Sequence, residues 1–365
     1  MTDQYSDLVT KNLVPSNTVW ERPKSRTQYI KHPDLGNDIK IVFDANGLKN
    51  SGEAKNNYLV GFFGDSFTEN RRVEEDFTFS KILNNISTKE NFANFGVDGF
   101  GLEQSVQRWI NFSESIDLKH VVYVFCSNDL RNTYEIQLFS ESSLNKNIFE
   151  NQIYEDSKKI SNKIVRSLGR LRITYLTRTA YYKVVGKVEE INEFGDRFPI
   201  KFEFLSNSQP KEFRDEYAGM LITDFLSTDP SDETLFYVNK FKKIINLWKN
   251  SLHERGIEFH VAILPRDLER KMSEKLFDRN INLIYLKKTE EYSLTKDFST
   301  TFKNDGHWNE LGNLAASVTL RSYFKDLKIW EEDTNESYEK DLFTEIIKYY
   351  SDRNSVPALN KEASQ

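Results

Sequence analysis

The sequence predicts an α/β protein: a three-layer α/β/α sandwich around a parallel sheet of about five strands, with an inserted α/β region that forms a lid. Three observations lead to this fold class. Short apolar runs lack the alternation of half-exposed strands, as expected where helices cover both faces of a parallel sheet. Helical patterns separate these runs. A stretch of about 100 residues in the middle of the chain breaks that alternation.

The elements follow in a regular order. We expect strands at residues 57–63, 91–95, 120–126, 257–265 and 282–286, and helices at residues 73–87, 102–111, 234–254 and 309–324. Strands separated by helices imply right-handed crossovers between parallel neighbours. The carboxyl ends of all five strands should therefore meet at one edge of the sheet.

The domain organisation follows from the same pattern. Residues 1–40 are polar and interrupted by prolines, so we interpret them as an extended arm laid over the domain. Residues 41–330 form the predicted main α/β domain, with the insertion at about 131–233. Residues 331–365 contain one more amphipathic helix and a polar tail.

Composition narrows the classes of function. The 365 residues carry a net charge of −6, which gives no electrostatic reason to expect nucleic acid as a partner. The single cysteine, Cys126, excludes an intramolecular disulfide, and no spacing of histidines and cysteines predicts a metal site. No segment has the apolar length of a membrane span or the h-region of a signal peptide, so the expected location is cytoplasmic. Neither a cofactor nor an oligomeric state is predicted.

The first strand runs into the sequence Gly64-Asp65-Ser66, which places a serine at the carboxyl edge of the sheet. Ligands bind at this edge in open α/β sheets. A serine between a strand and a helix is also a common helix N-cap, and for this short pattern alone capping is an equal alternative.

The next two strands also end in residues suited to binding a ligand. The second ends in "NFGVDGFG", where Gly99 belongs to a loop whose backbone can approach a ligand closely. The third ends in "CSND", which places Asn128 at the same edge. Tight turns explain the glycines equally well, and the asparagine could bond its own backbone. The coincidence at consecutive strand ends favours a site.

His307 is the best candidate base for Ser66. Among the five histidines, it alone lies in a polar loop with a carboxylate, Asp305, two residues away. This loop precedes the final helix of the sheet and so belongs at the same edge as Ser66. An imidazole can accept the hydroxyl proton near neutral pH, and a carboxylate can orient the ring.

With these residues the chain resembles the SGNH hydrolases, also called the GDSL esterase/lipase superfamily. The four motifs "GDS", "NFGVDGFG", "SND" and "DGH" appear in the order of that family. The resemblance implies a flavodoxin-like fold, Ser66 as nucleophile, and Asp305 and His307 as the rest of the triad. It also implies an oxyanion hole made by Ser66, Gly99 and Asn128.

Two motifs depart from the family pattern. The last motif reads D-x-H instead of D-x-x-H, which makes the orienting role of Asp305 less secure than the role of His307. The third block has Cys126 and Ser127 where the family has G-x, but the asparagine is retained.

The predicted function is a serine hydrolase of O-acyl esters. The "DANGLKNSG", "GDSFTEN" and "DGHWN" segments resemble the branch of the superfamily associated with glycans, which suggests a carbohydrate O-acetyl esterase. An O-acyltransferase and an inactive glycan-binding module remain alternatives. Arg131 and Trp308 are weaker candidates for substrate binding; a surface ion pair and packing at a helix start are their simpler explanations.

Overall fold

The computed structural model describes residues 14–16, 18–49, 54–87, 91–135, 138–139, 221–286, 298–303, 305–330 and 336–353. The predicted lid therefore lies largely outside the described residues. Of the insertion, the structure describes residues 131–135, 138–139 and 221–233.

A five-stranded parallel sheet forms the centre of the protein. Its strands are β5 (Asn57–Gly64), β6 (Phe92–Asn94), β7 (Asp117–Phe125), β8 (Glu258–Ile263) and β9 (Asn282–Tyr285). They lie in the order β6-β5-β7-β8-β9, and every neighbouring pair is parallel. This is the doubly wound order of flavodoxin-like folds, so the predicted fold class is confirmed.

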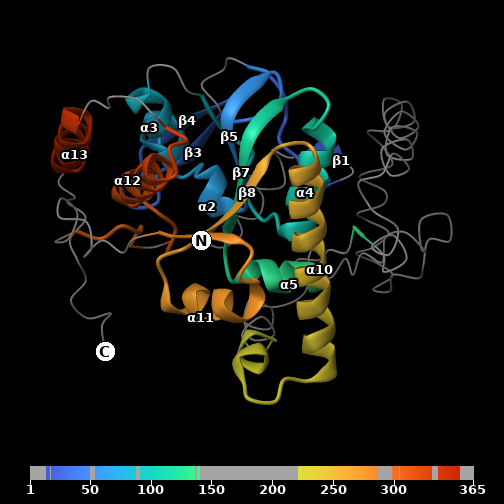
Figure 1. Ribbon diagram of the computed structural model, residues 1–365. Coiled ribbons are helices and arrows are strands. Elements are labelled where there is room, and N and C mark those ends of the chain that lie inside the picture. Colours follow the sequence, from blue (N-terminus) through green and yellow to red (C-terminus); the bar gives the residue numbers. More distant parts are fainter. Residues whose placement is uncertain are drawn as a thin grey trace, which may run out of the picture.

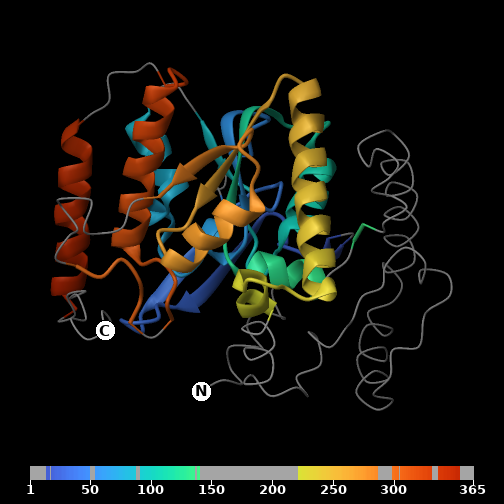
Figure 2. The same cartoon turned by 60° about the horizontal axis from the view of Figure 1, so that its bottom comes forward.

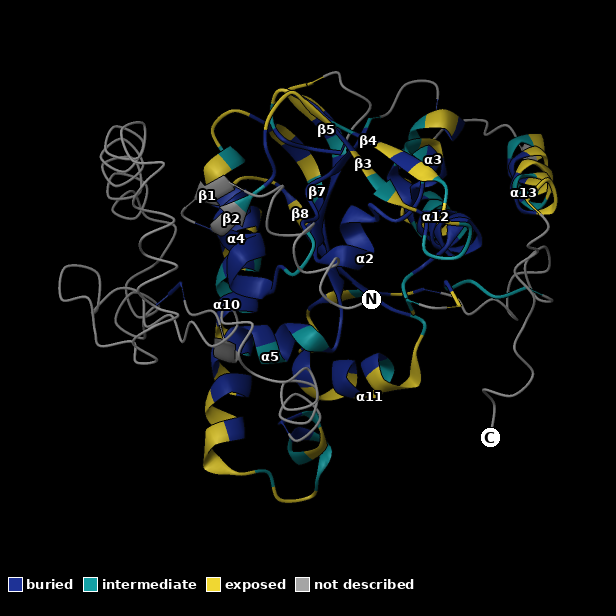
Figure 3. Cartoon of the chain, turned by 180° about the vertical axis from the view of Figure 1, so that it is seen from behind, coloured by how far each residue is buried: buried dark blue, intermediate teal, exposed yellow. Residues whose placement is uncertain are grey.

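Helices cover both faces of the sheet (Figures 1 and 2). One face carries α3 (Phe79–Ile86) and α12 (Glu310–Asp326), with α13 (Glu336–Ser351) outside them; the other carries α4 (Leu102–Phe112) and α10 (Asp232–Glu254). Two hydrophobic cores result, one on each face. Figure 3 shows the strands and the elements at the centre in the colour of buried residues, while exposed residues gather on the outer sides of the helices.

Short helices follow the carboxyl ends of three neighbouring strands. They are α2 (Ser66–Glu69) after β5, α5 (Asn128–Glu135) after β7, and α11 (Asp267–Leu276) after β8. All three lie along the same edge of the sheet (Figure 1). This edge therefore brings together the motifs that the sequence placed at strand ends.

Two helix predictions need correction. The helix expected at 73–87 is divided into a 3₁₀ turn, η1 (Glu75–Phe77), and α3, because Thr78 is extended and caps α3 by accepting a hydrogen bond from the backbone N–H of Lys81. Helix α11 was not predicted. Only two of its apolar residues, Met272 and Leu276, are buried, so it offers little apolar surface by which to recognise it.

The N-terminal arm contributes more to the interior than predicted. Besides the hairpin of β1 (Val14–Ser16) and β2 (Val19–Glu21), it forms an antiparallel pair of β3 (Arg26–Lys31) with β4 (Asp38–Phe43). The expected boundary near residue 40 falls within β4. Arg22 and His32 from this arm are buried in the domain, where they bind carboxylates of α2 and α12.

Candidate active site

Gly64 allows β5 to turn sharply into α2. Its φ of +149° is one that side chains rarely adopt, and an added Cβ would lie 2.8 Å from the backbone oxygen of Val124. Asp65 then caps α2 by accepting a hydrogen bond of 2.9 Å from the N–H of Phe67. The helix cap is thus Asp65, and the alternative role of Ser66 as N-cap is wrong.

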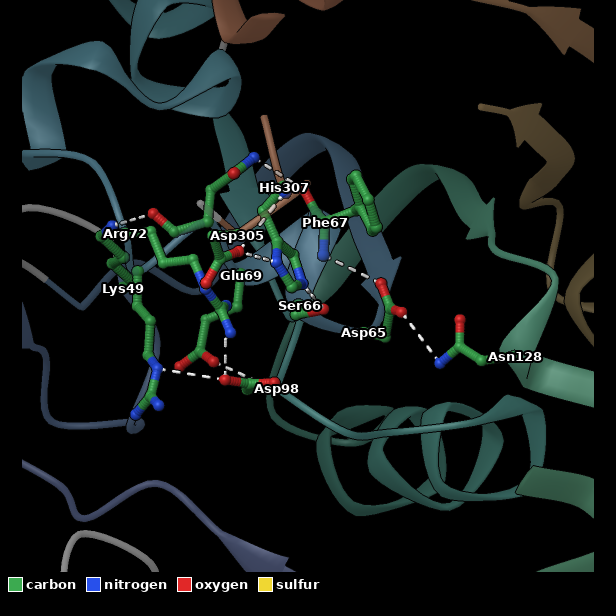
Figure 4. Close-up of polar contacts among 12 residues, drawn as sticks. Lys49, Asp65, Ser66, Phe67, Glu69, Arg72, Asp98, Asn128, Asp305 and His307 are labelled. Carbon is green, nitrogen blue, oxygen red and sulfur yellow. Dashed lines mark hydrogen bonds and ion pairs between the residues drawn. The ribbon is translucent and has the colours of Figure 1, made fainter. Parts of the chain in front are cut away.

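Ser66 lies against the imidazole of His307, 241 positions away in the chain. Ser66 Oγ is 2.7 Å from His307 Nε2, and Asp305 Oδ1 contacts Nδ1 on the other side of the ring (Figure 4). Because a carboxylate only accepts hydrogen bonds, Nδ1 of a neutral imidazole carries the proton and Nε2 accepts from the serine hydroxyl. This is the arrangement in which a hydroxyl can lose its proton to an imidazole.

The Asp305 carboxylate also accepts a hydrogen bond of 3.3 Å from the backbone N–H of His307. Its second oxygen, Oδ2, accepts one of 2.9 Å from Arg72 Nε. The short D-x-H spacing therefore still lets the carboxylate face the ring. Arg72 was not predicted as a site residue, since no sequence pattern relates it to Asp305.

Gly99 and Asn128 follow the two strands that flank β5. Gly99 has φ +81° in a turn closed by a 3.0 Å hydrogen bond from Phe100 N to Val97 O. Asn128 begins α5, and its Nδ2 donates to Asp65 Oδ2 at 3.3 Å. A side-chain amide has two N–H groups, of which this contact uses one. Both residues thus lie at the predicted edge, and their role as oxyanion donors stays a prediction.

Buried carboxyl groups surround the Asn128 side of the site. Burial raises the pKa of Asp65, although the hydrogen bond from the backbone N–H of Phe67 lowers it in part. Burial and the nearby Asp65 raise the pKa of Asp129 well above its usual value. Asp129 accepts hydrogen bonds from Tyr123 Oη at 2.7 Å and from the backbone N–H of Cys126 at 3.0 Å. These contacts fix the start of α5 beside Ser66.

The two weaker candidates have different environments. Trp308 is 4% exposed and makes T-shaped contacts with Phe67 and Phe79, which favours the packing explanation; its role in substrate binding stays a prediction. Arg131 lies on α5, one turn beyond Asn128, and is partly buried. Its role in substrate binding stays a prediction.

Arg266, which the sequence analysis did not single out, lies near His307 through the ring of Phe67. Its guanidinium sits 5.0 Å above the Phe67 ring, which itself lies 4.9 Å from the His307 ring. It also donates to the sulfur of Cys126 at 3.0 Å and pairs with Glu269. Cys126 is buried, and burial raises its pKa well above the usual value, in line with a core residue and not a nucleophile.

Within the described residues, no group of three or more histidine, cysteine, aspartate or glutamate side chains is placed to hold a metal ion. None of the described helices is both long and apolar enough to cross a membrane.

Comparison with known proteins gives one kind of match. Neither the protein-family models nor the curated proteins include a match to this chain. Among solved structures, the chain is similar to a member of the lipolytic protein G-D-S-L family from Veillonella parvula DSM 2008. The match has 11% sequence identity, covers 74% of this chain and 98% of that chain, and has a TM-score of 0.34.

The four sequence motifs lie along the fold in the predicted order. The sheet has the predicted order, the GDS, glycine-rich, SND and DGH segments follow its strands or precede its last helix, and the first and last of them meet through Ser66 and His307. The sheet order and the order of the motifs therefore agree with what the resemblance implied.

Proposed function

We propose that this protein is a serine hydrolase of O-acyl esters, with a carbohydrate O-acetyl ester as its substrate. The observation that supports this most directly is the 2.7 Å contact between Ser66 Oγ and His307 Nε2, with Asp305 on the far side of the ring. The glycan specificity depends on the sequence resemblance alone.

The proposed reaction has two steps. Ser66 Oγ attacks the ester carbonyl carbon while its proton passes to His307 Nε2, and the imidazolium then protonates the departing alcohol oxygen. Water next attacks the acyl-enzyme, giving a proton to the same nitrogen, and the proton returns to Ser66 as the carboxylic acid leaves. Backbone N–H groups of Ser66 and Gly99 and the Asn128 amide stabilise the oxyanion in both steps.

A serine-directed fluorophosphonate probe and a panel of p-nitrophenyl acyl esters test the chemistry. Wild-type protein should be labelled and should release p-nitrophenol, and Ser66→Ala should do neither. Ser317→Ala is a matched control, because Ser317 is also buried but donates its hydroxyl to Leu314 O within α12. An unlabelled wild-type protein, or a labelled Ser66→Ala variant, would reject the proposal.

Acetylated oligosaccharides test the substrate class. Release of acetate should depend on Ser66, and a non-acetylated sugar added as acceptor should leave the yield of free acetate unchanged. Transfer of the acetyl group to that sugar would instead identify an acyltransferase. Asn128→Ala should lower kcat by roughly 100- to 1000-fold if its amide stabilises the oxyanion.

A further inference from the structure

A series of buried charged groups extends from the far side of Asp305. Arg72 Nε donates to Asp305 Oδ2 at 2.9 Å, and Arg72 Nη1 lies 3.5 Å from Asp98 Oδ2 (Figure 4). One guanidinium therefore contacts both the carboxylate that faces His307 and the residue immediately before Gly99. It joins the loop of the last motif to the loop of the second motif.

The second-motif loop is also tied to the helix that carries Ser66. The backbone N–H of Asp98 donates to Glu69 Oε2 at 2.7 Å, and Glu69 is the last residue of α2. Arg22 from the N-terminal arm holds the same carboxylate through two hydrogen bonds of 2.6 and 2.8 Å. The contacts made by Arg72 thus belong to a network that includes three of the four motif segments of the site.

These groups are largely removed from solvent. The side chains of Arg72, Asp305 and Asp98 are 7%, 11% and 15% exposed. Burial alone would raise the pKa of Asp98, but Arg72 and Arg71 outweigh it and hold the pKa below its usual range. Charged contacts at this depth are screened far less than surface ion pairs, so Arg72 acts strongly on its neighbours.

The chain reverses direction just before Arg72. Asn70 adopts a left-handed conformation with φ +49° at the end of α2, and its Nδ2 donates to Phe67 O and to Asn313 Oδ1. Lys49 Nζ donates to Asn70 O at 2.6 Å. This fixed turn lets a residue six positions after Ser66 return to the site.

We propose that Arg72 is a positioning residue that aligns the Asp305 carboxylate with His307 and holds the Gly99 loop to the same anchor. This inference rests on the proposed serine-hydrolase function. Asp305 can face Nδ1 with one oxygen because Arg72 fixes the other.

The test compares kcat and KM for p-nitrophenyl acetate hydrolysis. Arg72→Gln should lower kcat by roughly 10- to 100-fold with little change in KM, because misaligned groups affect the reaction more than binding. Arg72→Lys keeps the charge but cannot reproduce both contacts, so its kcat should also fall.

Arg321→Gln is the matched control. Arg321 forms a similarly buried ion pair of 2.8 Å with Glu339 between α12 and α13, and takes no part in the contacts of the site. Its kcat and KM should match those of wild type even if it loses stability. A wild-type kcat in Arg72→Gln, or an equal kcat loss in Arg321→Gln, would overturn the inference. If Arg72→Gln does not fold, an Arg72→Lys variant with wild-type kcat would overturn it. Failure of the proposed function itself would appear differently, as wild-type protein without Ser66-dependent activity.

Discussion

Acidification should destabilise this protein through a histidine outside the active site. His260, on β8, is 1% exposed, with Nε2 3.3 Å from His120 Nδ1 and Nδ1 3.1 Å from Tyr323 Oη. Burial, assisted by His120, lowers the pKa of His260 from the ordinary 6.5 to about 4. The imidazole is thus neutral in the folded protein over a range of pH in which the unfolded chain would protonate it.

The sign and size of the effect follow from linkage. Between pH 6.5 and 4 the unfolded chain binds a proton that the folded protein excludes, so stability is present above pH 6.5 and is lost as the pH falls toward 4. The complete pKa difference corresponds to about 3 kcal/mol of unfolding free energy, of which about 2 kcal/mol is lost between pH 7.5 and pH 5.

Urea denaturation at pH 7.5 and pH 5 measures this loss in wild type and in His260→Gln. The variant lacks the titrating ring in both states, so its loss of stability between these pH values should be smaller by about 2 kcal/mol. His253→Gln, at an exposed position of α10, is the control and should behave as wild type. Equal acid losses in wild type and His260→Gln would refute the reasoning.

Three substitutions test the packing around the site. Phe63→Ala removes a fully buried ring whose centroid lies 4.5 Å from that of the stacked Phe95 ring. It should lower the free energy of unfolding by about 3–5 kcal/mol in urea denaturation, and a loss below about 1 kcal/mol would contradict tight packing of this core. Glu103→Ala removes the buried carboxylate that lies 2.7 Å from the Lys240 ammonium and should cost about 3–5 kcal/mol, whereas unchanged thermal stability would show that the pair is not buried in solution. Gly64→Ala introduces a Cβ 2.8 Å from the backbone oxygen of Val124 on β7, at a residue whose φ is +149°. The turn that positions Ser66 should be strained, so the rate of fluorophosphonate labelling should fall sharply; labelling at the wild-type rate would argue against a requirement for glycine.

The sequence predicted the sheet because a parallel strand covered on both faces is apolar throughout, as Asn57–Gly64 and Asp117–Phe125 are over their buried parts. It did not predict α11, which has few apolar residues among its charged ones and leaves one of them, Leu268, exposed. Thr78 divided the predicted 73–87 helix, because a cap residue competes with the apolar periodicity around it. Local patterns therefore specified the elements better than their boundaries.

Within the site, contacts between residues far apart in the chain were also hard to predict. Ser66 and His307 could be paired from the sequence because each lies next to a predicted strand or helix that orders the carboxyl edge. The pairing of Arg72 with Asp305 joins residues 233 positions apart, and that of Arg22 with Glu69 joins an arm to a helix. Such ion pairs depend on how loops and arms pack, which periodicity does not encode.

The spacing of the last motif provides a final test. Gly306, at φ +77°, turns the chain so that the Asp305 carboxylate reaches both the backbone N–H and the ring of His307 while Arg72 holds its second oxygen. Insertion of one glycine after Gly306 recreates the D-x-x-H spacing but moves the ring relative to a carboxylate that Arg72 keeps in place. We expect a loss in kcat of about 100-fold or more, measured with p-nitrophenyl acetate, and no comparable loss when glycine is inserted after the exposed Gly256. Wild-type kcat in the first variant would mean that the carboxylate follows the imidazole freely, and that the short spacing has no part in orienting His307.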